Sequence, residues 1–388
     1  MKHSRTLLPL ALAFLMAANA GPGRAAGPEW LAGDFHVHTT YSHDSWDPVS
    51  DDNTGPDEFY VLGHSVTNQF AIAASRGLDF LAITDHNDIR AQSDPGFGFG
   101  GVIPIHAYEN SLSGHAQMLG ATTIYDNGDK SAATVAALAD QVRADGGYFQ
   151  VNHPAGESVN WPHDADWGYD YDVVPDSVEV WNIQSIWQPP APSSNSNDSA
   201  IAYWEGWLRR GHHVGITGGS DNHWVSTTAA QGVGQPTTWV YANGPTESDI
   251  LAAVAAGRTT ISWQPPSSEG PRLFLQADAD GDGIFESMVG DTVPDGSSVR
   301  VLAENLPADA IVGVHTASGA FDLFTAEPSA TISLPAGAGW VWVDLLAPDG
   351  QSLPGAPLAP CDESIGDQTT YCRDRLVRLA MTSALYFE

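Results

Sequence analysis

Short apolar runs alternate with amphipathic stretches over the first two thirds of the chain. Seven runs have the length of single strands: "DFHVHT", "FLAITDH", "VIPIHAYE", "HAQMLGA", "GYFQVNHP", "SVEVWN" and "HVGITGGSDNH". The stretches "NQFAIAASRG", "SAATVAALADQVRADGG" and "DSAIAYWEGWLRRG" lie between them and end in glycine, the usual residue just past a last helical turn. This alternation predicts an α/β domain with a parallel sheet, and seven strands favour a (β/α) barrel.

The pattern changes after "WQPPSSEGP". The runs "RLFLQAD", "SSVRVLAENL", "AIVGVHTAS" and "GWVWVDLLAPDG" alternate apolar and polar positions and are separated by Gly, Pro and Asp. Such short strands between turn residues are typical of a small all-β, sandwich-like domain. We therefore predict a first domain over residues 27–265 and a C-terminal β-sandwich domain over 266–388.

The first twenty residues have a basic start, an apolar run and the small residues Ala18 and Ala20 at a secretory cleavage spacing. This predicts a signal peptide over residues 1–20 and a secreted or periplasmic protein. The apolar run is too short to span a bilayer, and no later stretch is long enough. In an oxidising compartment Cys361 and Cys372 favour one disulfide, with two buried thiols as the alternative.

Charge narrows the choice of partners. The chain has 47 acidic against 15 basic residues, and its formal net charge is −32. Such a field repels polyanions, so we expect no binding along a nucleic-acid backbone. The same field favours metal cations.

Unusual residues lie at the ends of the predicted strands. His86 ends "FLAITDH", Glu109 ends "VIPIHAYE" and His153 ends "GYFQVNH". In "DFHVHT", His36 and His38 point to the same side of an extended chain, because side chains alternate. The carboxyl ends of barrel strands converge on one rim, where carboxylates would repel one another without cations between them. One such histidine would be unremarkable, but this many predict a metal site.

The motifs "GDFHVHTTYSHD", "GLDFLAITDHND", "YENSLSGHAQMLG", "GGYFQVNHPA", "VEVWN" and "GGSDNH" carry a resemblance. In this order, from about Gly33 to Ile261, they resemble the PHP (polymerase and histidinol phosphatase) superfamily, most closely its carbaryl-hydrolase-like branch of metallohydrolases. The resemblance implies a distorted seven-stranded (β/α) barrel with a trinuclear metal centre.

The resemblance implies nine ligands: His36, His38, Asp44, His86, Glu109, His115, His153, Asp221 and His223. Glu109 would bridge a first ion, bound by the H-x-H pair and Asp221, to a second ion completed by His115 and His153. The third ion would take His86, His223 and Asp44, with His43 as the alternative to Asp44. Nitrogen and carboxylate ligands suit up to three Zn²⁺, Mn²⁺ or Fe²⁺ ions without selecting among them.

Three further residues stand close to these motifs. Asp85 is a candidate catalytic residue that would accept the second ring N–H of a metal-bound histidine. Arg90 is either an anchor for an anionic substrate group or an arginine on a helix surface. Glu179 in "VEVWN" is expected to pack or to support a ligand.

A bridged metal pair lowers the pKa of bound water and so makes hydroxide available at neutral pH. The chain has no G-x-S-x-G serine elbow. We therefore interpret it as a secreted metal-dependent hydrolase, a phosphoesterase acting on a small-molecule phosphate ester. The alternatives are carbamate, ester or amide hydrolysis, and a non-catalytic metal-containing binding module.

The C-terminal region contains "DADGDG". Asp278, Asp280, Asp282 and Gly283 reproduce the first half of a calcium loop. The usual bidentate Glu position is a valine, so only Glu286 or Asp291 could complete it. We expect a weak Ca²⁺ site here, with a solvated acidic turn as the alternative.

Overall fold

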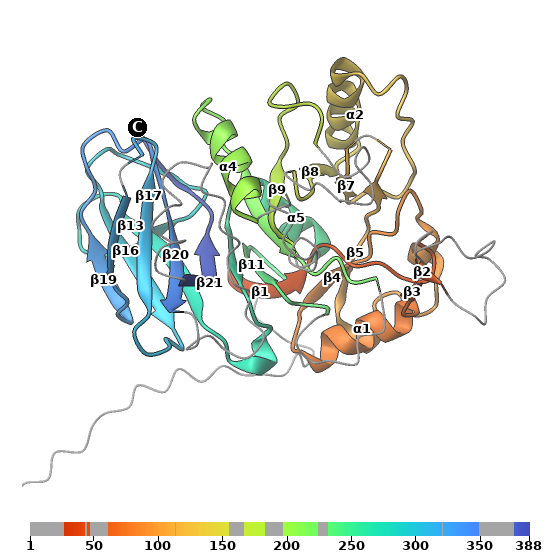
Figure 1. Ribbon diagram of the computed structural model, residues 1–388, viewed down its shortest axis with the longest axis horizontal. Helices are drawn as coiled ribbons and strands as arrows, with labels where there is room; N and C mark the ends of the chain where they lie inside the picture. The colour runs from red at the N-terminus through yellow and green to blue at the C-terminus, as the bar shows by residue number, and fades with distance from the viewer. Residues whose placement is uncertain are drawn as a thin grey trace, which may run out of the picture.

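The computed structural model describes residues 27–42, 45–46, 61–112, 114–154, 167–182, 197–223, 232–319, 321–348 and 376–388. Three predictions fall outside these residues: the signal peptide over residues 1–20, the choice between His43 and Asp44, and the Cys361–Cys372 disulfide. Figure 1 shows strands β13 to β21 grouped at one end of the molecule and helices α1 and α2 at the other.

One sheet is built around β1 (Glu29–Asp34), the first strand that the structure describes. On one side β1 pairs in parallel with β4 (Phe80–Ala82), which pairs in parallel with β5 (Ile103–Ile105). On the other side it pairs antiparallel with β11 (Thr237–Ala242), followed by antiparallel β12 (Thr259–Ser262). The sheet is therefore mixed, whereas the alternating pattern predicted parallel pairing.

A second sheet has the order β10-β9-β8-β7-β6. Its strands are β6 (Glu109–Asn110), β7 (Ala116–Leu119), β8 (Tyr148–Val151), β9 (Ser177–Asn182) and β10 (Gly215–Gly219). The pairs β8–β9 and β9–β10 are parallel, and the pairs β6–β7 and β7–β8 are antiparallel. The run "VIPIHAYE" was predicted as one strand, but it divides into β5 of the first sheet and β6 of the second.

Isolated parallel bridges join the two sheets just beyond their strand ends. One bridge pairs Val37 with Asn222, and the other pairs His86 with Glu109. The segment after β1 thus lies against the segment after β10, and the segment after β4 lies against the start of β6. The seven-stranded barrel stays a prediction, because the described strands from β1 to β12, apart from the β2–β3 pair, lie in two bridged mixed sheets.

Helices α1 (Val66–Ser75), α2 (Ala132–Ala144) and α4 (Asn197–Leu208) lie where the sequence predicts helices. The structure adds α5 (Glu247–Ala255), which lies outside the three predicted stretches. Ser65, Ser131 and Thr246 cap the starts of α1, α2 and α5 by accepting a backbone N–H three residues later. None of the helices that the structure describes has the length and apolarity needed to span a bilayer.

The remaining described elements are two short strands, three 3₁₀ turns and the strands of the C-terminal region. Strands β2 (Ser45–Trp46) and β3 (Val61–Leu62) pair with each other, and the 3₁₀ turns are η1 (Arg90–Ser93), η2 (Phe99–Gly101) and η3 (Pro266–Ser268). The strands after η3 are β13 (Arg272–Asp278), β14 (Ser287–Met288), β15 (Thr292–Val293), β16 (Ser298–Glu304), β17 (Ile311–Thr316), β18 (Phe321–Thr325), β19 (Ser329–Ile332), β20 (Trp340–Pro348), β21 (Leu376–Thr382) and β22 (Leu385–Phe387).

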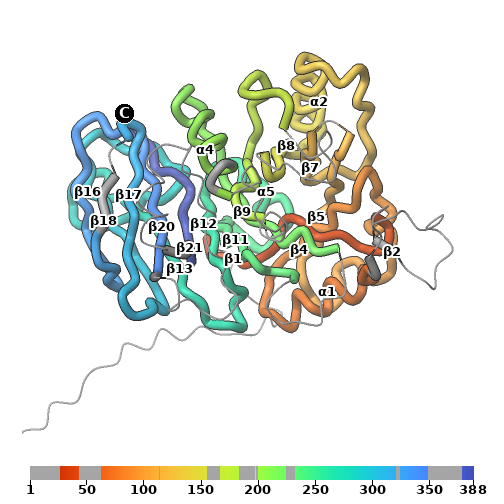
Figure 2. Tube along the Cα trace, in the orientation of Figure 1, coloured from red at the N-terminus to blue at the C-terminus, as the bar shows by residue number. Residues whose placement is uncertain are grey.

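These later strands enclose a core of their own. Leu275 of β13 and Val301 of β16 pack in one buried cluster with Val343 of β20. The first sheet runs into this region, because β12 pairs antiparallel with β21, with Ile261 opposite Met381. The predicted boundary near Pro266 therefore falls at η3, but one sheet continues across it. Figure 2 traces this course from β1 at the N-terminal end to β21.

Candidate metal centre

The H-x-H segment extends beyond β1 with both imidazoles on one side. The Nε2 atoms of His36 and His38 lie 3.1 Å apart, while Val37 between them is buried. The amide of Gln69 on α1 donates to the backbone carbonyl of His38 at 2.6 Å, and His38 N donates to Asn222 O at 3.0 Å. These bonds fix the segment, so the predicted common orientation of the two rings is confirmed.

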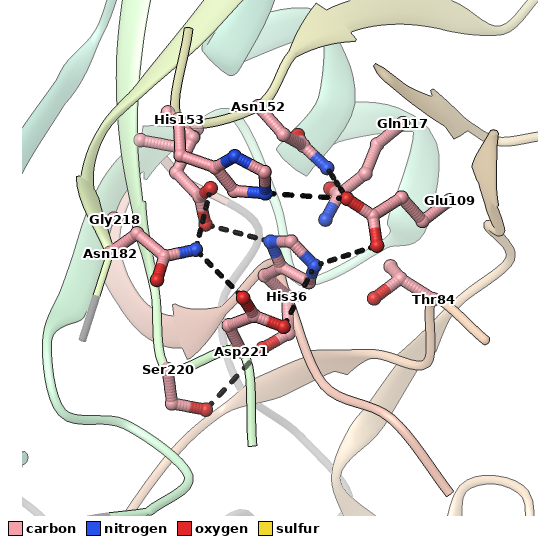
Figure 3. A network of polar contacts seen from close by, with 12 residues as sticks. His36, Thr84, Glu109, Gln117, Asn152, His153, Asn182, Gly218, Ser220 and Asp221 are labelled. Atoms are coloured by element: carbon pink, nitrogen blue, oxygen red, sulfur yellow. Dashed lines mark hydrogen bonds and ion pairs between the residues drawn. The ribbon is translucent and has the colours of Figure 1, made fainter. Parts of the chain in front are cut away.

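Glu109 is fully buried and lies next to the ring of His36, which is at the centre of the network in Figure 3. Its Oε1 accepts from Asn152 Nδ2 at 2.8 Å and lies 3.0 Å from His115 Nδ1. Its Oε2 lies 3.0 Å from His86 Nδ1 and 3.2 Å from His36 Nε2. Among the described residues Oε2 has no partner with hydrogen-bond geometry. Imidazole nitrogens gathered around such an oxygen fit ligands that share a cation.

Asp221 presents its two carboxylate oxygens differently. Oδ1 lies 3.1 Å from His38 Nε2 and 3.3 Å from His36 Nε2. Oδ2 accepts from the side-chain amide of Asn182 at 3.2 Å. The ring of His223 stacks on that of His38, with centroids 3.7 Å apart. Oδ1 is therefore the oxygen that faces the histidines.

Eight of the nine predicted ligands form overlapping groups whose ligand atoms lie within 4.8 Å of one another. The groups are His38–His86–His223, His36–His153–Asp221, His36–His38–Glu109 and His86–Glu109–His115. Because the groups share members, neighbouring ions would share ligands. This donor set suits Zn²⁺, Mn²⁺ or Fe²⁺ and leaves the identity and number of ions undetermined.

Charge in the centre is balanced by the imidazoles. Burial disfavours a proton on His36, but the carboxylates of Asp221, Glu179 and Glu109 hold its pKa well above the usual value. Burial would raise the pKa of Glu109, but neighbouring histidines, His36 first, hold it well below its usual value. For His38, burial and two neighbouring imidazoles lower the pKa to about 4. Without an ion, protonated imidazole supplies the positive charge that the carboxylates require.

The backbone is strained at several ligand positions. His115, His153 and Asp221 have positive φ values of 45°, 26° and 49°, and Asn87 beside His86 has 50°. Non-glycine residues in this region cost on the order of 1–3 kcal/mol each, and such residues cluster at functional sites. No sequence signal marks these positions, since none is glycine.

The structure gives Glu179 and Asp85 different roles. Glu179 Oε1 lies 2.9 Å from His36 Nδ1, so Glu179 contacts a predicted ligand. Both oxygens of Asp85 accept from Thr39, at 2.6 Å from the backbone N and 2.7 Å from Oγ1, instead of from a histidine ring. Burial raises the pKa of Asp85 to about 7 despite these bonds. Asp85 therefore anchors the segment after His38, which differs from its predicted role.

Arg90 lies at the edge of this region. Its side chain is 50% exposed, and Nε donates to Asp88 Oδ2 at 2.8 Å. The guanidinium lies 5.0 Å from the ring centroid of Tyr41, within cation–π range. This placement fits the surface-arginine alternative, and the anion-anchor role stays a prediction.

Sequence reasoning missed the amide and hydroxyl groups around the ligands. Asn152 holds Glu109, Asn182 holds Asp221, and the Ser42 hydroxyl lies 3.0 Å from His38 Nδ1. The two asparagines close the runs "FQVN" and "VEVWN", where a polar residue ends a buried strand. The position of an asparagine at the end of a buried strand was the sequence signal that could have identified both residues.

The acidic loop of the C-terminal region is also formed. Asp278, Asp280, Asp282 and Glu286 offer oxygens within 4.8 Å of one another, so Glu286 joins the group. Asp278 is buried and accepts from the backbone N–H groups of Gly281 and Gly283 at 2.7 and 2.9 Å. Exposed acidic groups are common without an ion, so the Ca²⁺ site stays a prediction.

Comparisons with known proteins give distant matches. The model of a family described as "Protein of unknown function (DUF3604)" matches residues 27–143, which is less than half of the chain. No curated protein matches. A two-domain protein from Bacteroides vulgatus ATCC 8482, described as containing a predicted PHP-like metal-dependent phosphoesterase, has 14% identity and a TM-score of 0.41. That match covers 82% of this chain and 90% of the other.

A second solved structure, from Bifidobacterium adolescentis ATCC 15703 and described as "a putative metal-dependent phosphoesterase", also has 14% identity. This match covers 52% of this chain and 90% of the other chain, with a TM-score of 0.31. At these TM-scores the likeness is too remote to establish the fold.

Proposed function

We propose that this chain is an exported metal-dependent phosphoesterase of the PHP superfamily that acts on small phosphate esters at a trinuclear centre. The observation that carries the proposal is the set of four overlapping, largely buried His/Asp/Glu groups around Glu109. The order of the sequence motifs supports it independently. Bound ions would supply an activated water and neutralise charge on a phosphoryl oxygen.

The chain's own residues would hold the ions and orient them. Glu109 directs Oε1 toward His115 and Oε2 toward His36 and His86, so its two oxygens would contact different ions. Asp221 would add Oδ1 beside His36 and His38. Since every one of these side chains is largely buried, their geometry is set before an ion enters, which favours tight and specific binding.

Elemental analysis combined with a substrate panel tests the proposal. The metal-supplemented protein should contain two to three transition-metal ions per chain. It should hydrolyse p-nitrophenyl phosphate or bis-p-nitrophenyl phosphate, lose that activity with a chelator and regain it with Mn²⁺ or Zn²⁺. Glu109→Gln should lose activity, and the control Glu247→Gln should keep it, because Glu247 pairs with His106 outside the four groups.

Each other outcome has a defined meaning. Turnover of a naphthyl carbamate without turnover of either phosphate ester would favour the carbamate hydrolase. Bound metal without turnover of any substrate would favour the binding module. Fewer than one ion per chain after supplementation would refute the metal centre itself.

A further inference from the structure

Glu179 determines which nitrogen of His36 is presented to the centre. It lies on β9, is 1% exposed, and its Oε1 is 2.9 Å from His36 Nδ1. A carboxylate can only accept, so Nδ1 carries the proton of this contact. The other nitrogen, Nε2, then faces Glu109 Oε2 and Asp221 Oδ1 at 3.2 and 3.3 Å.

Asn182 completes the arrangement from the end of the same strand. Its Nδ2 donates to Glu179 Oε2 at 3.0 Å and to Asp221 Oδ2 at 3.2 Å. One amide thus ties the residue that holds His36 to the carboxylate that lies beside His36. Figure 3 shows Asn182 next to Asp221. Asn182 is itself held, because its backbone N–H donates to Asn197 Oδ1 at 3.0 Å.

A local irregularity makes this contact available. On a regular strand, residues three apart point to opposite faces. The pairing of β9 with β10 shifts register between Thr217 and Gly218: Thr217 lies opposite Glu179, and Gly218 opposite Trp181. Such bulges re-aim side chains next to functional sites. The shift accounts for Asn182 and Glu179 meeting on the same side.

Gly219 provides the space for Glu179. A Cβ built on Gly219 would lie closer than 3.0 Å to both Glu179 Oε1 and His36 Cβ. Any side chain at this position would therefore displace the pair. The second glycine of "GGSDNH" is required by this close approach.

We propose that Glu179 and Asn182 are positioning residues that select the ligand atoms of one metal position. Glu179 presents Nε2 of His36, and Asn182 occupies Oδ2 of Asp221 so that Oδ1 faces the ion. This inference rests on the proposed metal centre and adds to it which chain residues determine the geometry of that position. Neither residue belongs to the four groups of potential ligand atoms, so each would act through His36 or Asp221.

Metal binding to the full-length, metal-depleted protein tests the proposal directly. Zn²⁺ affinity is measured by competition with a chromophoric chelator for wild type, Glu179→Gln, Asn182→Ala and the double variant. A glutamine can satisfy His36 or Asn182 but not both, because its Nε2 is a donor. In each single variant the affinity for one Zn²⁺ ion should fall by about 10–100-fold, the range typical of residues that hold metal ligands in place. In the double variant the fold-loss of Zn²⁺ affinity should be smaller than the product of the two single fold-losses, because both residues act on the same ion.

A control variant and a spectroscopic measurement separate this role from general destabilisation. Glu247→Gln removes the same charge from another His–Glu pair, with His106 Nδ1 3.0 Å from Glu247 Oε2, and should bind metal as wild type does. The visible spectrum of the Co²⁺-loaded protein should change in Glu179→Gln and Asn182→Ala but not in Glu247→Gln. If Glu179→Gln does not fold without metal, Asn182→Ala decides the question.

Unchanged Zn²⁺ affinity and an unchanged Co²⁺ spectrum in the folded variants would overturn the positioning role and leave the metal centre intact. Absence of metal binding by the wild type would instead refute the proposed function.

Discussion

Gly219→Ala adds one methyl group beneath the candidate metal centre. The new Cβ would lie closer than 3.0 Å to His36 Cβ and Glu179 Oε1, and 3.3 Å from His36 Cα. Non-bonded carbon atoms prefer separations of about 3.5–4.0 Å. The β10 backbone and the His36 segment must therefore move apart by several tenths of an ångström or more. Both neighbours are buried, so neither can turn into solvent.

Overpacking a tightly packed interior typically costs about 1–3 kcal/mol. The contacts involve a carbon next to the backbone and a hydrogen-bonded carboxylate, not the free end of a flexible chain, so we expect about 2–3 kcal/mol on that scale. The same displacement moves His36 and loosens its contact with Glu179. Zn²⁺ affinity should consequently fall by about 10-fold or more.

Urea unfolding followed by tryptophan fluorescence measures the first effect, in the presence of a chelator so that metal binding does not contribute. Chelator competition measures the second. The matched control is Gly168→Ala, where an added Cβ meets nothing within 4 Å, and it should change stability by less than about 0.5 kcal/mol. If Gly219→Ala behaves like this control in both measurements, the close approach has no energetic consequence and the reasoning fails.

Three other changes test separate parts of the molecule. Glu109→Gln should reduce the metal content by two ions per chain in elemental analysis, because the two oxygens of Glu109 face different histidines; a loss of one ion or none would contradict bridging. Asp344 is fully buried, and despite that burial His315 and Arg378 hold its pKa below the usual 3.8. Its contribution to stability is therefore complete above about pH 4 and is lost as the pH falls through the folded-state pKa. Asp344→Asn should lower the free energy of unfolding in urea by about 3 kcal/mol at pH 7, and stability should then fall less at acid pH than in wild type. An unchanged dependence of stability on pH would show that the pair with Arg378 is not stabilising. Calcium should raise the melting temperature of wild type but not of Asp280→Ala/Asp282→Ala, and equal shifts would make the acidic loop a turn only.

Local features of the fold could be predicted from the sequence, whereas the pairing of strands could not. Helix α2 begins one residue after Ser131 and ends close to the double glycine, because capping and apolar spacing act within a few residues. The antiparallel pairing of β7 with β8 depends on contacts between Ala116 and Val151, far apart in the chain. Periodicity carries no information on such pairing, so a parallel sheet was the default expectation.

The candidate site shows the same division. His36, His38, His86 and His153 could be singled out because each follows a buried strand and carries a ligand side chain. His115 was found through the family resemblance alone. The end of a buried strand was a signal for Asn182, but its contact with Glu179 could not be predicted, because that contact depends on the register shift opposite Thr217 and Gly218. Non-local backbone geometry of this kind leaves no pattern in the sequence.

The predicted ligands are divided between the two sheets, and this division suggests a reason why strain and buried charge persist at the candidate centre. His36, His38 and His86 follow strands of the first sheet, whereas Glu109 lies in β6 of the second sheet. The four others lie just outside strands of the second sheet: His115, His153, Asp221 and His223. The two sets meet where isolated bridges join Val37 to Asn222 and His86 to Glu109. Ions held by ligands from both sets would connect the sheets at this seam. The free energy of metal binding would then offset two costs. One is the left-handed backbone conformation at Asp221, and the other is the repulsion between the buried carboxylates.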